Sequence, residues 1–153
     1  MDMVWNDDTL KLYHSGIDRG ALYIRNPASG DYDVGVPWNG LISVTETPEG
    51  AEETKLYANN TIYATLLSTE EFGGSIEAYT FPDEFMACDG GVETDPGVVL
   101  NQQNRAIFGM AYRQRIGSAS GGDEIGYKYH LVYGCRAQPS EQSLSTVNDS
   151  PEA

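Results

Sequence analysis

The chain has 153 residues, enough for one domain that buries roughly two thirds of the surface exposed by its unfolded form. Its 23 acidic and nine basic residues give a net charge of −14, which argues against binding to DNA phosphates, because that binding needs clustered Lys and Arg. Two cysteines cannot build a disulfide framework, and no apolar run approaches the ~20 residues that span a bilayer. No apolar signal segment follows Met1, so we expect a soluble protein that is made in a cytoplasm and has no membrane anchor.

Short runs of alternating apolar and polar residues, each bounded by turn residues, predict β-strands through most of the chain. After a turn-rich lead-in, strands are expected at residues 21–25, 41–47, 55–57, 61–67 and 75–81. Pro48 ends the second of these strands, and residues 58–60 join the third and fourth as a hairpin turn. Many short strands with regular turns indicate a sandwich or barrel.

One short helix is expected at residues 82–88. Pro82 suits the first turn of a helix, and Asp83 and Glu84 carry negative charge at its positive end. Asp89 and two glycines follow and end the segment.

The longest alternating stretch, residues 105–137, predicts a long projecting hairpin with a flexible, glycine-rich tip at residues 117–126. We expect its two apolar sides to share one face, with five of the nine Lys and Arg residues on the other. The predicted core joins this apolar face to residues of the earlier strands: Phe108, Met110, Tyr112, Leu131 and Tyr133 with Ile42, Val44, Ile76 and Ala78.

The basic side of this hairpin is expected to meet acidic protein. Residues 105–136 carry five basic and two acidic residues, so the rest of the chain has a charge of −17. Such segregation suits a head-to-tail contact between identical subunits, which joins two different patches. The candidates for the subunit interface are Arg113, Arg115, Lys128 and Arg136, whose guanidinium and ammonium groups pair with carboxylates.

The sequence shows no motif of a catalytic or metal site. The two histidines, His14 and His130, lie in no nucleophile–base arrangement, and Cys88 is expected to be a buried structural thiol. A carboxylate pair such as Glu77 with Asp83 or Glu84 is expected by chance in so acidic a chain. We therefore expect no enzyme activity and no cofactor or metal.

Several longer runs carry a family resemblance. They are residues 16–23, 38–40, 76–85 with 88–90, 127–134 and 148–153. In this order they resemble the major tail protein of long-tailed, non-contractile bacteriophages, the subunit of the tail tube. Similar proteins continue past the last run into another β-strand, so we expect either a missing strand or an incomplete sequence.

The resemblance implies one tail tube domain over residues 1–153, an antiparallel β-sandwich or half-barrel with a short flanking helix. It also implies homohexameric rings stacked into a tube, which serves as a conduit for DNA ejection into the host. Expected partners are other copies of the chain, tape measure, tail terminator and distal tail proteins, and double-stranded DNA that passes without specific binding. The protein would assemble in the host cytoplasm and reside in the virion tail.

A tube that passes DNA is expected to have an acidic or neutral inner wall, because Lys and Arg would hold the duplex through counterion release. The candidates for lumen-facing carboxylates are Glu77, Asp123 and Glu124.

An alternative function is a carbohydrate- or receptor-binding β-sandwich on a virion or cell surface. The tyrosines would then form a binding platform, with Tyr79, Tyr112, Tyr127, Tyr129 and Tyr133 as candidates. We favour the interpretation that these rings belong to the core of a sheet, where aromatic residues are common.

Overall fold

The computed structural model describes residues 3–142 and 144, and for Asp123 and Glu124 it describes the backbone alone. The described residues are mainly β, with 56% of them in strands and 4% helical, and they include no helix of seven or more residues. The sheets are antiparallel, which confirms the expected fold class. No helix in the described ranges is long and apolar enough to cross a membrane.

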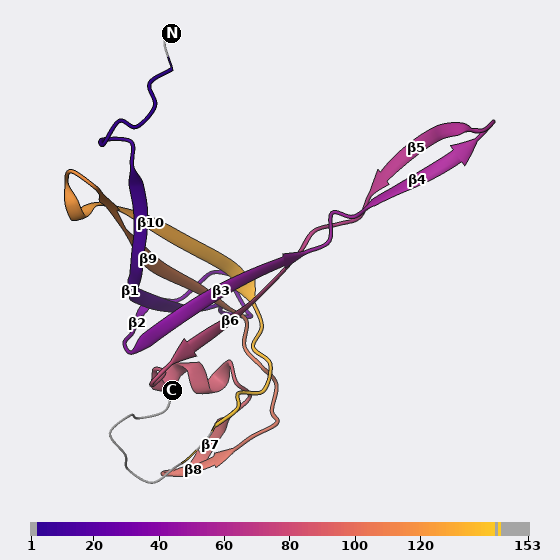
Figure 1. The fold of residues 1–153 in the computed structure, drawn as a ribbon. Coiled ribbons are helices and arrows are strands. Elements are labelled where there is room, and N and C mark those ends of the chain that lie inside the picture. Colours follow the sequence, from indigo (N-terminus) through magenta and orange to yellow (C-terminus); the bar gives the residue numbers. More distant parts are fainter. Residues whose placement is uncertain (1–2, 143, 145–153) are drawn as a thin grey trace. The chain divides into compact units, whose positions relative to one another are not determined.

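The chain divides into two units, Met1–Ile42 with Ala78–Ala153, and Ser43–Glu77. We call the second the hairpin unit. The first contains β1 (Leu12–Ile24), β2 (Val36–Trp38), η1 (Asp83–Ala87), β7 (Val92–Asp95), β8 (Val98–Leu100), β9 (Phe108–Ser118) and β10 (Gly122–Cys135). The hairpin unit contains β4 (Glu53–Ala58), β5 (Thr61–Leu67) and most of β3 (Leu41–Glu49) and β6 (Glu71–Ala78). Figure 1 labels the strands and draws η1 as a coiled ribbon.

A four-stranded antiparallel sheet in the order β10-β9-β1-β2 forms the centre of the first unit. The hairpin predicted at residues 105–137 is confirmed as the antiparallel pair β9–β10. It lies within the sheet and is not a free two-stranded arm, because β9 also pairs with β1 (Figure 1). Strand β1 begins at Leu12, inside the predicted lead-in. Two register shifts, with positive φ at Gly16 and Arg19, interrupt its alternation and conceal the strand in the sequence.

The pairing of β9 with β10 places the apolar runs of these strands on opposite faces of the sheet. Met110 lies opposite Val132, and Tyr112 lies opposite His130. Leu131 therefore points to the other face, as do Tyr127 and Tyr129, which lie opposite Arg115 and Arg113. The expectation that the apolar sides coincide is wrong, and the basic residues are divided between the two faces as well.

The hairpin tip explains this register. Only residues 119–121 separate the two strands, where a ten-residue loop was expected, and Gly121 N–H donates a 2.7 Å hydrogen bond to Ser118 Oγ. Gly122 pairs with Ser118, and a register shift follows before Gly126 pairs with Ile116. Because side chains alternate with period two, an irregularity at the tip decides which face each later residue occupies.

The core of the first unit lies on the Met110 face of the sheet. Its buried apolar residues are Leu22, Trp38, Phe85, Cys88, Phe108, Met110 and Tyr112. The ring of Phe85 from η1 lies 5.0 Å from that of Trp38 and meets Phe108 edge-on at 5.5 Å, measured between ring centroids. Trp38 Nε1 donates a 2.9 Å hydrogen bond to the carbonyl of Thr80.

The predicted core is thus confirmed in part. Phe108, Met110 and Tyr112 are buried, whereas Leu131 is 59% and Tyr133 70% exposed, because they lie on the opposite face. Of the residues expected from the earlier strands, Ile42 is exposed and Val44, Ile76 and Ala78 are half-buried. The short helix predicted at residues 82–88 is present as the 3-10 helix η1, and its Phe85 packs against Trp38 and Phe108.

A small hairpin, β7–β8, was not predicted. Val92 lies opposite Leu100 and Glu93 opposite Val99. The turn between the strands contains Gly97 with a φ of 82°, a value that favours glycine.

The hairpin unit contains the β3–β6 pair and the predicted β4–β5 hairpin. Asn59 and Asn60 have φ values of 52° and 62°, typical of a two-residue turn that matches the strand twist. Strand β6 begins at Glu71, four residues before the start of the strand predicted at residues 75–81. A Cβ on Gly74 would lie 2.6 Å from the carbonyl oxygen of Thr45, so this glycine permits close approach of two strands.

Candidate interaction surface

Strand β10 displays a row of large, solvent-exposed side chains. We call Tyr127, Tyr129, Leu131 and Tyr133 the tyrosine face; all four are exposed. They share one face because they alternate along the strand, opposite the side that faces the core. Strand β10 is also an edge strand of its sheet, so one side of its backbone has no partner strand in the part of the chain that the structure describes.

An ion-pair cluster lies beside the tyrosine face. Arg113 Nε donates a 2.7 Å hydrogen bond to Asp18 Oδ1, and Arg113 Nη2 binds Asp18 Oδ2 in a second contact. Arg115 Nη2 lies 3.3 Å from the same Oδ2. Arg113 is only 7% exposed, and its guanidinium lies 3.9 Å above the centre of the Tyr127 ring.

The cluster has two electrostatic consequences. The hydrogen bonds from Arg113 lower the pKa of Asp18 from 3.8 to about 2, with a smaller contribution from Arg115, and the same contact raises the pKa of Arg113. Because one carboxylate faces two guanidinium groups, the cluster retains one net positive charge next to the tyrosine face.

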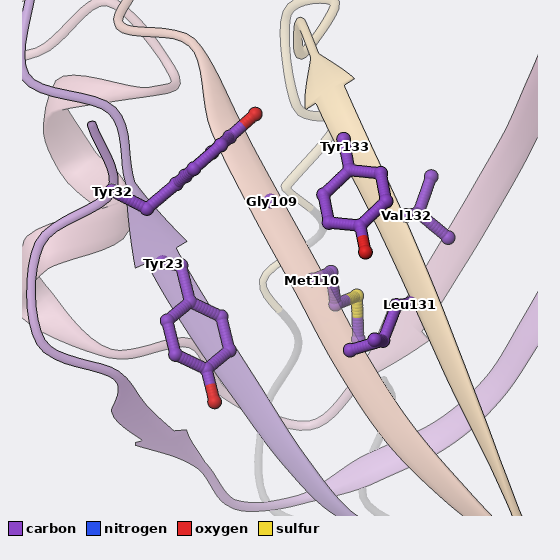
Figure 2. A pocket seen from close by; sticks show the side chains of 7 residues that line it. All are labelled: Tyr23, Tyr32, Gly109, Met110, Leu131, Val132 and Tyr133. Atoms are coloured by element: carbon purple, nitrogen blue, oxygen red, sulfur yellow. The ribbon is translucent and has the colours of Figure 1, made fainter. Parts of the chain in front are cut away.

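A shallow apolar pocket of about 170 Å³ lies at the end of this face (Figure 2). It is lined by Tyr23, Tyr32, Gly109, Met110, Leu131, Val132 and Tyr133. Figure 2 shows the rings of Tyr23, Tyr32 and Tyr133 around Gly109. The Tyr32 hydroxyl accepts a 2.9 Å hydrogen bond from Gly134 N–H, and a Cβ on Gly109 would lie 3.2 Å from the Tyr32 ring. The pocket is therefore preformed.

The basic candidates for a subunit interface do not form one cluster. Arg113 and Arg115 share Asp18 on the tyrosine face, whereas Lys128 lies opposite Gln114, on the other face of the sheet. Arg136 follows the end of β10 and is exposed. Their role in subunit contacts stays a prediction, and Arg113 already has its carboxylate partner within the chain.

The acidic candidates for the lumen belong to two different units. Glu77 lies in the hairpin unit, where Ser43 Oγ donates a 3.2 Å hydrogen bond to its Oε2. The side chains of Asp123 and Glu124 lie outside the described residues, as do residues 148–153 and any strand beyond them. Their orientation toward a lumen stays a prediction.

Two of the residues considered for catalysis, His130 and Cys88, contact or are buried by neighbouring side chains of the fold. His130 stacks on Tyr112 with ring centroids 4.7 Å apart and lies 3.2 Å from Gln114 Oε1. Burial and the charge of Asp89 raise the pKa of the Cys88 thiol to about 11, so thiolate is scarce at neutral pH. Among the described residues, no three His, Cys, Asp or Glu side chains lie together as metal ligands.

The hairpin unit offers a second uncovered surface. Leu56 lies opposite Ala64 on one face of the β4–β5 hairpin, and Leu66 lies two residues along on that same face. Both leucines are exposed. The unit carries seven acidic residues and one basic residue, Lys55.

Sequence reasoning missed the roles of Asp18 and Tyr32. Asp18 lies in the segment predicted as a turn-rich lead-in, because the bulges of β1 hide the strand, and Tyr32 lies between the strands predicted at residues 21–25 and 41–47. Asp18 is the one carboxylate in residues 12–24, but these residues do not alternate regularly, so the sequence does not indicate that Asp18 pairs with the arginines of β9. Comparisons of the chain with models of protein families, with curated proteins and with solved structures find no match.

Proposed function

We propose that the chain is a structural virion protein that assembles with its own copies into stacked rings, the tail tube through which phage DNA leaves the capsid. The proposal is supported by the runs of sequence that resemble the major tail protein of non-contractile phages, above all residues 76–85 and 127–134. A mainly antiparallel β chain with one short helix agrees with it.

The observation that carries the proposal is the amount of uncovered apolar surface. In the described part of the chain, exposed large apolar side chains outnumber those in the core. They include neighbouring residues on the tyrosine face and on both faces of the β4–β5 hairpin. Contiguous apolar surface of this kind marks a site of association, and a two-stranded hairpin is marginally stable by itself. Contacts between copies would cover both surfaces.

The net charge of −14 agrees with a passive conduit. A wall with excess carboxylates repels the DNA phosphates, and this repulsion is screened beyond ~8 Å at physiological salt, so it acts near the wall. The proposed function requires no reaction and no cofactor. It requires association between copies and weak affinity for DNA.

Sedimentation velocity of the purified protein over a range of concentrations tests association. We expect species much larger than one chain, increasing with concentration. A single monomeric species at every concentration would overturn the proposal.

A second candidate function, binding of carbohydrate or a receptor, is favoured by one finding. Tyr127, Tyr129 and Tyr133 are exposed on one sheet face, which contradicts the expectation that they belong to the core. A row of exposed rings suits stacking against sugars. Specific binding to a glycan array by a protein that stays monomeric would support this candidate against the first.

A further inference from the structure

The aliphatic face of the β4–β5 hairpin lacks a cover in its own unit. It comprises Leu56, Ala64 and Leu66, which the pairing of Thr54 with Leu66 and Leu56 with Ala64 sets side by side. Leu56 is 42% exposed, whereas Leu67, on the opposite face, is 73% exposed. The Leu67 face carries the charged residues Glu53 and Lys55, whereas the two residue pairs of the Leu66 face, Thr54 with Leu66 and Leu56 with Ala64, are uncharged. A face with exposed leucines and no charged residue among its pairs is suited to burial against another protein surface.

The tyrosine face has complementary properties. Leu131 lies at its centre, between Tyr129 and Tyr133, and the pocket beside it is lined by apolar atoms and aromatic rings. Tyr127 is held in place by Arg113, and Tyr32 by Gly134 N–H. A partner therefore meets an ordered surface, which reduces the entropy lost on binding.

The charges of the two surfaces are opposite. The hairpin unit has a net charge of −6, from seven acidic residues and one basic residue. The cluster of Asp18, Arg113 and Arg115 has a net charge of +1, and the Arg115 side chain is 42% exposed. In a chain with a charge of −14, this cluster is a local excess of positive charge to which glutamates of a second copy are attracted.

We propose that the hairpin unit of one copy binds the tyrosine face of a second copy, with the face of Leu56 and Leu66 against Leu131 and its neighbouring tyrosines. Arg115 of the second copy then pairs with a glutamate of the bound hairpin. This inference rests on the proposed function and names the surfaces that would associate. Two different patches meet in such a contact, so each copy can bind one neighbour and receive another, and the contact builds rings or open arrays.

The most direct test joins the two surfaces chemically. One sample of full-length chain carries Leu66→Cys and a second carries Leu131→Cys, both with Cys135→Ser because Cys135 is only half-buried. The samples are mixed, assembled and oxidised. We expect a disulfide-linked dimer that contains one copy of each, since neither variant alone can join residue 66 to residue 131.

The matched control replaces Leu66→Cys by Leu67→Cys. Residue 67 neighbours residue 66 but lies on the other face of β5, so the yield with Leu131→Cys should fall at least about fivefold, because the two faces of a strand point in opposite directions. Equal yields, or no linked dimer in samples whose rings or tubes are seen by electron microscopy, would overturn the inference and leave the proposed function standing. Absence of any assembly would overturn both.

A second measurement does not depend on cysteine. Leu66→Lys and Leu131→Glu each place a charge in the proposed contact, and each alone should weaken self-association at least about tenfold. An equimolar mixture should recover association, because one contact is then unaltered and the other pairs opposite charges. No recovery on mixing would contradict the contact. Glycan binding that Leu131→Glu abolishes in a monomeric protein would assign the tyrosine face to carbohydrate and overturn the inference.

Discussion

Asp18 is the residue on which the ordering of the Arg113 side chain depends. It lies in a bulged part of β1, and both of its oxygens accept hydrogen bonds from Arg113. Without Asp18 the nearly buried guanidinium of Arg113 would lack its carboxylate partner. The folded state would then be less stable, because the remaining positive charge is poorly solvated.

Asp18→Asn should therefore lower the free energy of unfolding at pH 7. The folded-state pKa of Asp18 is about 2, below the ordinary 3.8, so its contribution is fully present above about pH 4 and is lost as pH falls toward 2. Urea unfolding of the native chain and the variant at several pH values measures this difference. A difference that stays constant from pH 7 to pH 2 would contradict the role of the ionised carboxylate.

Phe108 and Leu131 lie on opposite faces of the central sheet and should respond differently to truncation. Phe108→Ala removes a buried ring in contact with Phe85 and should cost ~3–5 kcal/mol. Leu131→Ala, the control, removes an exposed side chain and should change stability by less than about 1 kcal/mol. Urea unfolding of a non-associating sample checks both values. A larger loss of stability for Leu131→Ala than for Phe108→Ala would show that the Leu131 face of the sheet, and not the Phe108 face, is the buried one.

At the scale of elements, the sequence predicts strands better than it predicts their faces. The β4–β5 hairpin was predicted because its turn contains two asparagines and its strands alternate. The face occupied by Leu131 could not be predicted, because the irregular pairing between Gly122 and Gly126 determines it. The first part of β1 was missed for the same reason, since the bulges near Gly16 and Arg19 interrupt the period of two.

The absence of a side chain at Gly74 permits the close approach of β6 to β3. Because a Cβ there would meet the backbone oxygen of Thr45 at 2.6 Å, Gly74→Ala should separate β3 from β6 and cost about 1–3 kcal/mol. Amide exchange in β6 should become faster. Gly126→Ala is the control, since a Cβ at Gly126 meets nothing within 4 Å. Unchanged exchange in β6 of the Gly74 variant would contradict the close approach.

At the scale of the whole molecule, the candidate surface could be predicted only in part. The basic residues Arg113 and Arg115 were identified, but Asp18, which is distant in sequence, neutralises one of their charges. The tyrosines were expected in the core, because a sequence does not show which side of an amphipathic strand faces a partner. The register of the sheet must be known before these aromatic residues can be assigned to the core or to an exposed face.

The charge of the molecule predicts weak affinity for DNA. With −14 per chain, assembled protein should not retain duplex DNA even at about 50 mM salt, because few counterions are released on contact. Filter binding of a duplex to the assembled protein, compared with a variant that carries Glu77→Lys, measures this affinity. Tight binding that weakens steeply with salt would contradict a repelling passage.

Electron microscopy of the concentrated, purified chain tests the central claim most directly. The proposed function predicts rings and hollow tubes built from copies of the chain, with a continuous central channel wide enough for a DNA duplex. Separate monomers, or aggregates without a channel, under conditions in which the chain is folded would contradict it.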